Sequence, residues 1–157
     1  MIVIGYPCVG KSTYTTGHPY RAIDLESSNF IKDENWVESY CNVAIDLSRQ
    51  GHVVFVSSHD VVRKQLLKSD YKYIFAIYPA LDIKEEWLKR LHERYLKTGL
   101  DKDYRAWQRA LNHYDEDIAA LKEDTKSFGG FYEIGYDRYD LTVILDEFDY
   151  GSTWDHS

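Results

Sequence analysis

Apolar and polar residues along the chain follow two patterns that alternate with each other. Short continuous apolar runs are typical of strands that are buried on both faces of a parallel sheet. Between these runs lie longer stretches with an apolar residue at every third or fourth position, which places the apolar side chains on one face of a helix. The alternation predicts a single α/β domain over residues 1–157, with a mainly parallel sheet and right-handed crossovers.

Five short runs are the predicted strands, and they lie at 1–4, 21–25, 52–57, 71–78 and 141–145. The run at 52–57 has the continuous apolar character of a central strand. The glycine- and aromatic-rich segment 128–138 predicts an irregular connection before the last strand. The acidic tail at 146–157 predicts turns, because it is too short for another large element.

The helical stretches are predicted at 11–17, 33–50, 60–68, 83–97 and 103–124. Gly17 and Pro19 end the first of them, because glycine and proline break helices. Asp60 and Asp82 stand where the N-caps of the third and fourth helices are expected. The fifth stretch is the most regular helix in the chain, with apolar and aromatic residues at an unbroken spacing of three or four.

The junction between the first strand and the first helix has the sequence GYPCVGKST, from Gly5 to Thr13. This is the GxxxxGKS spacing at which successive backbone N–H groups encircle a phosphate at the positive end of a helix. The two glycines allow a close backbone approach, the lysine places a cation on the β- and γ-phosphates, and the serine offers a hydroxyl to Mg²⁺. The predicted nucleotide-binding residues are Gly5, Cys8, Val9, Gly10, Lys11, Ser12 and Thr13.

Composition and charge narrow the class of protein. The formal charge of −7 and the pI near 5.3 argue against general electrostatic attraction to nucleic acid or to an anionic membrane. The sequence has two cysteines, no CxxC pair, and no apolar run that approaches the roughly 18 residues of a membrane span. These features predict a soluble cytoplasmic protein with no structural zinc site.

A cationic segment lies at 84–109, where eight Lys/Arg and five Asp/Glu residues give a formal charge of +3 within the acidic chain. Arg90 and Arg94 lie one helical turn apart and can reach the same anion, so they are candidates to stabilise a transferred phosphoryl group. The alternative is a solvated helix face on which Glu86 and Glu93 pair with the two arginines.

Charged residues also lie at or just after the C-terminal ends of the second and third predicted strands, at the edge where open parallel sheets bind ligands. Asp24 and Asp60 are both candidates to support Mg²⁺, and Glu26 is a candidate to bind an acceptor hydroxyl or to act as its base. Arg63 is a candidate to hold an acceptor phosphate. Each has a structural alternative, which is a strand end or helix cap for the acids and a surface position for Arg63.

Three features resemble the nucleoside-monophosphate-kinase-like group of P-loop phosphotransferases, which includes guanylate, adenylate, shikimate and small viral deoxynucleotide kinases. Gly5 to Thr13 is close to the guanylate-kinase form of the loop, and Asp24-Leu25-Glu26 resembles the paired acids of shikimate-type kinases. Tyr78-Pro79, followed by the basic stretch 88–94, resembles the strand, proline and lid helix of the group.

The resemblance implies a three-layer P-loop fold with a five-stranded sheet in the order 2-3-1-4-5. It also implies an acceptor region at about 24–66 and a helical lid at about 84–109. The chain departs from the group at 26–62, where Arg49 is its only arginine, whereas guanylate-type kinases place arginine and tyrosine clusters there. The chain also has no room for the small guanine-recognising domain, so an acceptor that bears a hydroxyl rather than a phosphate stays open.

The expected function is ATP- and Mg²⁺-dependent phosphoryl transfer to a small acceptor, in the first place a nucleoside or deoxynucleoside monophosphate. The predicted catalytic residues are Lys11, Arg90, Arg94 and Glu26. One alternative is a kinase of a polynucleotide 5′-hydroxyl or of another small hydroxyl compound. Another is a non-kinase P-loop ATPase or nucleotide-binding module. The ATPase is suggested by the segment 142–147, an apolar run followed by two acids that can hold Mg²⁺ and activate water.

Overall fold

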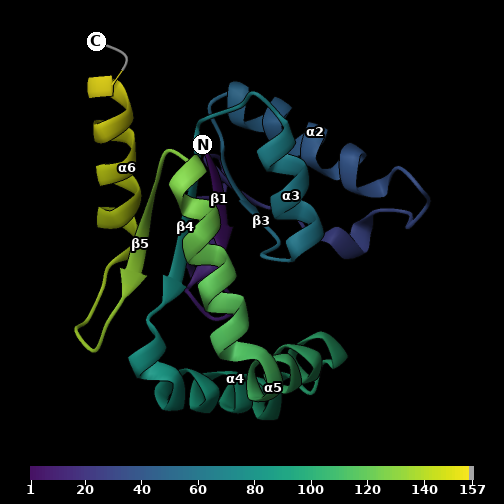
Figure 1. The fold of residues 1–157 in the computed structure, drawn as a ribbon, viewed down its shortest axis with the longest axis vertical. Coiled ribbons are helices and arrows are strands. Elements are labelled where there is room, and N and C mark those ends of the chain that lie inside the picture. The colour runs from purple at the N-terminus through teal and green to yellow at the C-terminus, as the bar shows by residue number, and fades with distance from the viewer. Residues whose placement is uncertain (156–157) are drawn as a thin grey trace.

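The computed structural model of the chain contains one sheet of five strands (Figure 1). It describes residues 1–155, with side chains described through Asp149. The strands are β1 (Ile2–Gly5), β2 (Ala22–Asp24), β3 (Val53–Val56), β4 (Ile74–Pro79) and β5 (Gly130–Ile134). All neighbouring pairs are parallel, and the order is β2-β3-β1-β4-β5, which confirms the predicted order.

The central strands have the continuous burial that their apolar runs predict. Every residue of β1, β3 and β4 is buried, and Ile2 of β1 lies opposite Val54 of β3 and Ile74 of β4. Because β1 is in the middle of the sheet, the segment that follows it leaves the carboxyl edge between two neighbouring strands. Ligands of open parallel sheets bind at this kind of position.

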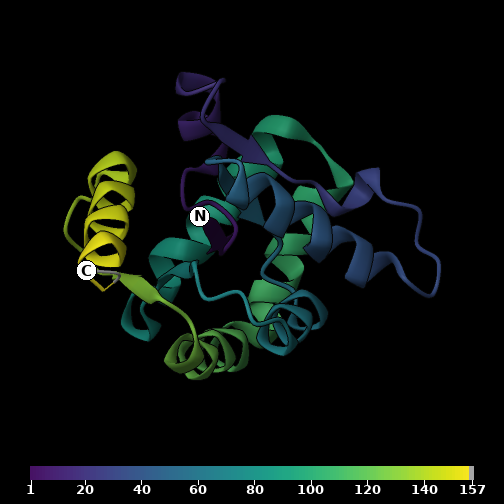
Figure 2. The ribbon, with the colours of Figure 1, turned by 90° about the horizontal axis from the view of Figure 1, so that it is seen from above.

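The α-helices of the described residues cover both faces of the sheet. They are α1 (Lys11–Gly17), α2 (Trp36–Arg49), α3 (Asp60–Lys68), α4 (Lys84–Thr98), α5 (Asp101–Asp124) and α6 (Leu141–Asp155). Helices α2, α3 and α5 pack on one face, and α1 and α6 lie on the other (Figure 2). The chain therefore has the three layers predicted for it.

The last strand and the last helix correct the sequence prediction. The predicted strand at 141–145 is the first part of α6, and the predicted irregular connection contains β5. In α6 the buried residues Leu141, Ile144 and Leu145 have helical spacing, while Val143 between them is 53% exposed. Strand β5 lies at the sheet edge and is only partly buried, so it needs no continuous apolar run.

Two predicted caps are also wrong. His59 is the N-cap residue of α3, and Asp60 is the first residue inside that helix. Helix α4 follows a short 3₁₀ turn at Leu81–Ile83, so Ile83, and not Asp82, occupies its N-cap position. Neither cap residue makes a side-chain capping hydrogen bond.

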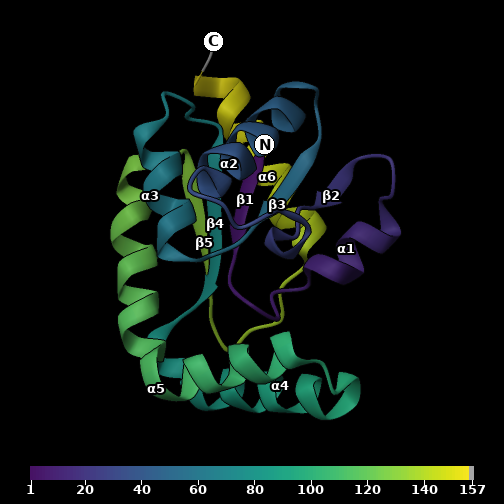
Figure 3. The same ribbon diagram turned by 90° about the vertical axis from the view of Figure 1, so that its right-hand side faces the viewer.

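Helices α4 and α5 form a hairpin that projects past the carboxyl edge of the sheet (Figure 3). Gly99 turns the chain between them in a left-handed conformation, with φ of 65°. Helix α5 is kinked at His113, where φ is −139° and ψ is 17°. Aromatic contacts join the two helices near the tip, with His92 stacked on Trp107 at 4.3 Å between ring centroids. The cationic segment 84–109 lies within this α4–α5 hairpin (residues 84–112).

Candidate functional site

The candidate site begins with residues 5–11, the Gly5–Lys11 loop, which joins β1 to α1. A Cβ atom on Gly5 would lie 3.0 Å from Cδ of Lys11 and 3.1 Å from Cγ2 of Val9, so a larger residue would force these two side chains to shift. Gly10, immediately before α1, has φ of 108°, which glycine adopts far more readily than other residues. The structure thus gives a physical reason for glycine at both positions of the sequence motif.

Side chains from outside the loop hold two of its carbonyl groups. Trp87 of α4 donates its indole N–H to the carbonyl of Pro7 at 2.8 Å. The hydroxyl of Tyr139, in the segment between β5 and α6, donates to the carbonyl of Val9 at 3.0 Å. Neither role is predicted from the sequence, because no local pattern marks Trp87 or Tyr139 as a partner of the loop.

The two predicted arginines of α4 approach the loop from one side. Arg90 Nη1 lies 3.5 Å from the hydroxyl of Tyr139, and its guanidinium lies 4.5 Å from the centroid of the Trp87 ring. Arg94 Nη1 lies 3.8 Å from Sγ of Cys8. Both arginines also have acidic partners, because Arg90 Nε is 3.6 Å from Oε1 of Glu86 and Arg94 Nε is 3.3 Å from Oδ1 of Asp103.

Lys11 lies among opposite and like charges at the start of α1. Burial is the main cause that lowers the pKa of its ammonium group, and Arg94 and Lys102 act in the same direction. Asp24 and Glu26 act in the opposite direction, so these two carboxylates are close enough to stabilise the charged lysine. Lys102 Nζ lies 3.7 Å from Oε1 of Glu26, which joins the hairpin to the segment after β2.

The position of the two carboxylates depends on Tyr40 of α2. Its hydroxyl donates to the carbonyl of Leu25 at 2.6 Å and accepts from the N–H of Ser57 at 2.9 Å. The buried Tyr40 hydroxyl therefore joins the segments that follow β2 and β3. Leu25, whose carbonyl it binds, lies between Asp24 and Glu26 in the sequence. Burial raises the pKa of the Asp24 carboxyl, despite the opposing effect of Lys11.

Replacement of Asp24 by asparagine is expected to raise the melting temperature at neutral pH. Because the pKa of Asp24 is raised in the folded chain, this carboxyl favours folding when it is protonated, and the contribution is lost as pH rises through the folded pKa. The gain in the variant should therefore shrink as the pH is lowered toward the ordinary carboxyl range. Thermal unfolding at several pH values checks this, and a lower melting temperature at neutral pH would show that attraction to Lys11 outweighs burial.

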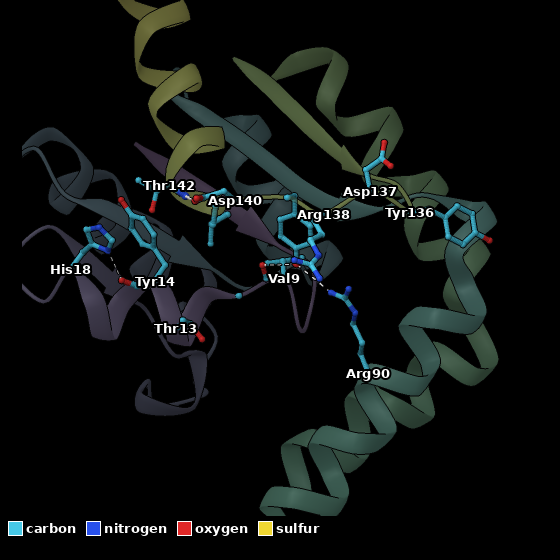
Figure 4. A pocket seen from close by; sticks show the side chains of 13 residues that line it. Val9, Thr13, Tyr14, His18, Arg90, Tyr136, Asp137, Arg138, Asp140 and Thr142 are labelled. Atoms are coloured by element: carbon cyan, nitrogen blue, oxygen red, sulfur yellow. Dashed lines mark hydrogen bonds between the residues drawn. The ribbon is translucent and has the colours of Figure 1, made fainter.

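A cavity of about 580 Å³ opens beside the loop (Figure 4). It lies between the start of α1, Arg90 of α4 and the segment 136–142 that follows β5. On the α1 side, His18 stacks on Tyr14 at 4.1 Å between ring centroids. The cavity lining includes the loop after β5 and the first two residues of α6, Leu141 and Thr142, which belong to the segment predicted as a strand.

Two predicted acceptor and metal residues lie away from this cluster. Arg63 is 7% exposed, and its guanidinium donates from Nε to Asp124 at 2.7 Å and from Nη1 to the carbonyl of Ser58. This ion pair joins α3 to the end of α5 and does not support the predicted contact with an acceptor phosphate. The Asp60 side chain is exposed and lies 3.5 Å from Nζ of Lys64, whereas Asp24 is the aspartate that interacts with Lys11.

The pattern that suggested a non-kinase ATPase is not a strand. Residues 142–147 lie inside α6, and Asp146 of this segment is 4.0 Å from Arg21. The apolar-strand-plus-acids arrangement that such ATPases use is therefore absent from this segment. Within the described residues, no group of three or more His, Cys, Asp or Glu side chains is arranged to hold a metal.

Together, the fold and site define an α/β protein with an all-parallel five-stranded sheet and a glycine-lysine loop after its central strand. Comparison with models of known protein families, with curated proteins and with solved structures gave no match in any of the three. Among the described residues, no helix is both long enough and apolar enough to cross a membrane.

Proposed function

We propose that this protein is an ATP- and Mg²⁺-dependent kinase that transfers a phosphoryl group to a small acceptor. The observation that carries the proposal is the position of Lys11, which lies at the end of the Gly5–Lys11 loop and interacts with Asp24, Glu26 and Arg94. Phosphoryl transfer needs charge neutralisation and positioning more than covalent chemistry. A cationic loop and carboxylates around one point supply both requirements.

The donor nucleotide fits the two adjoining features of the site. Its phosphates would meet the backbone N–H groups of the loop, Lys11 and the N-terminus of α1. Its base and ribose would occupy the cavity of about 580 Å³, whose size is within the usual range for small-molecule sites. Arg90 lines this cavity, and Arg94 lies beside Cys8 in the loop.

Ser12 and Asp24 are the residues that would hold Mg²⁺. Ser12 is exposed in the first turn of α1, and the partly buried Asp24 interacts with the neighbouring Lys11. A magnesium ion that is bound to phosphates needs only one or two protein ligands, so this hydroxyl and carboxylate are a sufficient set. Bound magnesium would neutralise charge on the phosphates, while Lys11 and Arg94 bind the same region from the protein side.

Tyr139→Phe is expected to weaken ATP binding about 3- to 10-fold, the value of one ordinary hydrogen bond. The variant loses the bond to the Val9 carbonyl and the contact with Arg90, but it keeps the ring. Calorimetric titration with ATP and Mg²⁺ measures the effect, and Tyr20→Phe is the control because Tyr20 is 94% exposed. Unchanged ATP affinity in Tyr139→Phe would remove Tyr139 from the proposed donor site.

The proposed function is tested with ATP labelled on the γ-phosphate, Mg²⁺ and a panel of acceptors. The panel holds nucleosides, their 5′-monophosphates and a 5′-hydroxyl oligonucleotide, and the products are separated by chromatography. Transfer of label to at least one class, above the release of free phosphate without acceptor, is the expected result. Release of free phosphate alone, or no use of ATP, contradicts the proposal.

A further inference from the structure

The acceptor region of the proposed kinase is acidic. Residues 24–66 contain four Lys/Arg and seven Asp/Glu residues, a formal charge of −3. The carboxylates that interact with Lys11 are Asp24, the last residue of β2, and Glu26, two residues later. An acceptor with a phosphate group would bring two further negative charges next to them, and like charges at short range repel.

The cations of this region are engaged elsewhere. Arg63 is paired with Asp124, and Arg49 lies 5.5 Å from the centroid of the Tyr71 ring. The other two cations are Lys32, whose ammonium lies 3.6 Å from the centroid of the Trp36 ring, and Lys64, which is paired with Asp60. Each of the four thus already has a partner in the structure.

Three cations of the α5 arm of the hairpin, Lys102, Arg105 and Arg109, are also paired with carboxylates. Lys102 reaches the acceptor side, but it lies 3.7 Å from Glu26. Arg109 is bound through two hydrogen bonds of 2.8 Å to Asp117, and Arg105 lies 3.2 Å from Asp101. A phosphate on the acceptor would have to displace a carboxylate at each of these positions. Of the two hairpin arginines next to the Gly5–Lys11 loop, Arg90 lines the donor cavity, and Arg94 lies beside Cys8 and is paired with Asp103 at 3.3 Å.

The carboxylates of Asp24 and Glu26 are better matched to an acceptor that carries a neutral hydroxyl group. The side chain of Glu26 is 41% exposed, so an acceptor can reach it. Tyr40 binds the carbonyl of the preceding residue, Leu25, and so holds the backbone next to Glu26. Phe30 and Trp36 pack against the Tyr40 ring at 5.2 Å and 6.2 Å between centroids, which places aromatic rings beside the same segment. Aromatic rings of this kind stack on nucleobases with little base preference.

We infer that the acceptor is the uncharged hydroxyl of a nucleoside, and that Glu26 accepts the proton of this hydroxyl. This inference rests on the proposed kinase function. The hydroxyl O–H bond breaks and its proton passes to the Glu26 carboxylate, while the hydroxyl oxygen forms a bond to the γ-phosphorus of ATP. The bond from the γ-phosphorus to the bridging oxygen breaks, its electron pair stays on the β-phosphate of ADP, and Glu26 then releases the proton to water.

The test compares each nucleoside with its own 5′-monophosphate as acceptor, at fixed ATP and Mg²⁺, by kcat/KM. The expected result is a value at least about tenfold higher for the best nucleoside than for its monophosphate. A 5′-hydroxyl oligonucleotide is included, because it presents the same hydroxyl on a charged polymer. Glu26→Gln is expected to lower kcat for the nucleoside by about 10²- to 10⁴-fold, the usual contribution of a general base.

Two further variants separate the loss of a base from other effects. Lys102→Met removes the ion pair with Glu26 but keeps the carboxylate, so its kcat should fall less than about tenfold if proton transfer is the role of Glu26. Asp70→Asn removes an exposed carboxylate outside the acceptor region and should leave kcat within about twofold. Equal losses in Glu26→Gln and Lys102→Met would overturn the role of Glu26.

The outcomes for the acceptor and for the kinase are distinct. Transfer to monophosphates at equal or higher kcat/KM overturns the nucleoside inference and leaves the proposed kinase function in place. Transfer to the oligonucleotide alone also overturns it, in favour of a polynucleotide acceptor. Transfer to none of these compounds overturns both the inference and the kinase function on which it rests.

Discussion

Replacement of Lys11 by methionine is expected to abolish phosphoryl transfer and, at the same time, to raise the thermal stability of the protein. Methionine keeps most of the side-chain length that packs over Gly5 but removes the ammonium group. Removal of one preorganised donor that stabilises charge in the transition state typically lowers kcat by about 10²- to 10³-fold. We therefore expect at least this loss of kcat, together with weaker ATP binding.

The stability gain follows from the lowered pKa of Lys11. Burial makes the charged lysine less favourable in the folded chain than in the unfolded chain, so the full penalty is present below the lowered folded pKa. The penalty decreases as pH rises from the lowered folded pKa to the ordinary lysine value, because the folded chain loses its proton first. The stability gain of the methionine variant should thus be largest below the lowered folded pKa and small in strong alkali.

Paired assays of turnover and melting temperature on the same preparations measure both effects. Lys89→Met is the matched control, because Lys89 is an exposed lysine of α4. It should change neither quantity noticeably. A Lys11→Met protein that loses activity and stability together would mean that Lys11 mainly supports the fold, which would contradict the role that we propose for it.

The sequence is sufficient to predict the centre of the fold. The apolar runs of β1, β3 and β4 are buried on both faces, so hydrophobicity alone marks them, and the glycine-lysine motif marks the turn between β1 and α1. The last strand and the last helix, β5 and α6, are harder to predict. In α6 the buried residues 141, 144 and 145 continue at Phe148, which stacks on Phe75 at 4.5 Å between centroids. This helical spacing could have identified the helix, although the segment 141–145, with four apolar residues and one threonine, resembles a strand.

The contacts that support the candidate site are much less accessible to sequence reasoning. Trp87 is 80 residues from Pro7 along the chain, and Tyr139 is 130 residues from Val9. Each pair has no local pattern, because the contact depends on how the α4–α5 hairpin and the β5–α6 segment pack against the loop. Residue types can show that Lys11 and Asp24 have useful chemistry, but the fold decides that Asp24, and not Asp60, interacts with the lysine.

Arg63 is another residue whose role depends on the fold and could not be predicted from the sequence. Its replacement is the second change for which we expect a large effect, here on stability. We expect Arg63→Ala to lower the free energy of unfolding by about 3 kcal/mol, because it removes one partner of a largely buried ion pair and leaves Asp124 without its cation. The Arg63 side chain is 8% exposed and that of Asp124 is 21% exposed. The contact joins α3 to the end of α5, which are 61 residues apart in sequence.

Urea unfolding distinguishes this structural role from the acceptor role that the sequence suggests for Arg63. The double variant Arg63→Met, Asp124→Leu should recover most of the lost stability, since replacing both charges by apolar groups leaves no unpaired ion. Arg105→Ala is the control: its pair with Asp101 is exposed on both sides, and its removal should cost less than about 1 kcal/mol. If Arg63→Ala kept full stability and raised only the KM for the acceptor, Arg63 would be an acceptor ligand after all. The four cations of the acceptor region would then include one that is free to bind a phosphate, and the nucleoside inference would lose its main support.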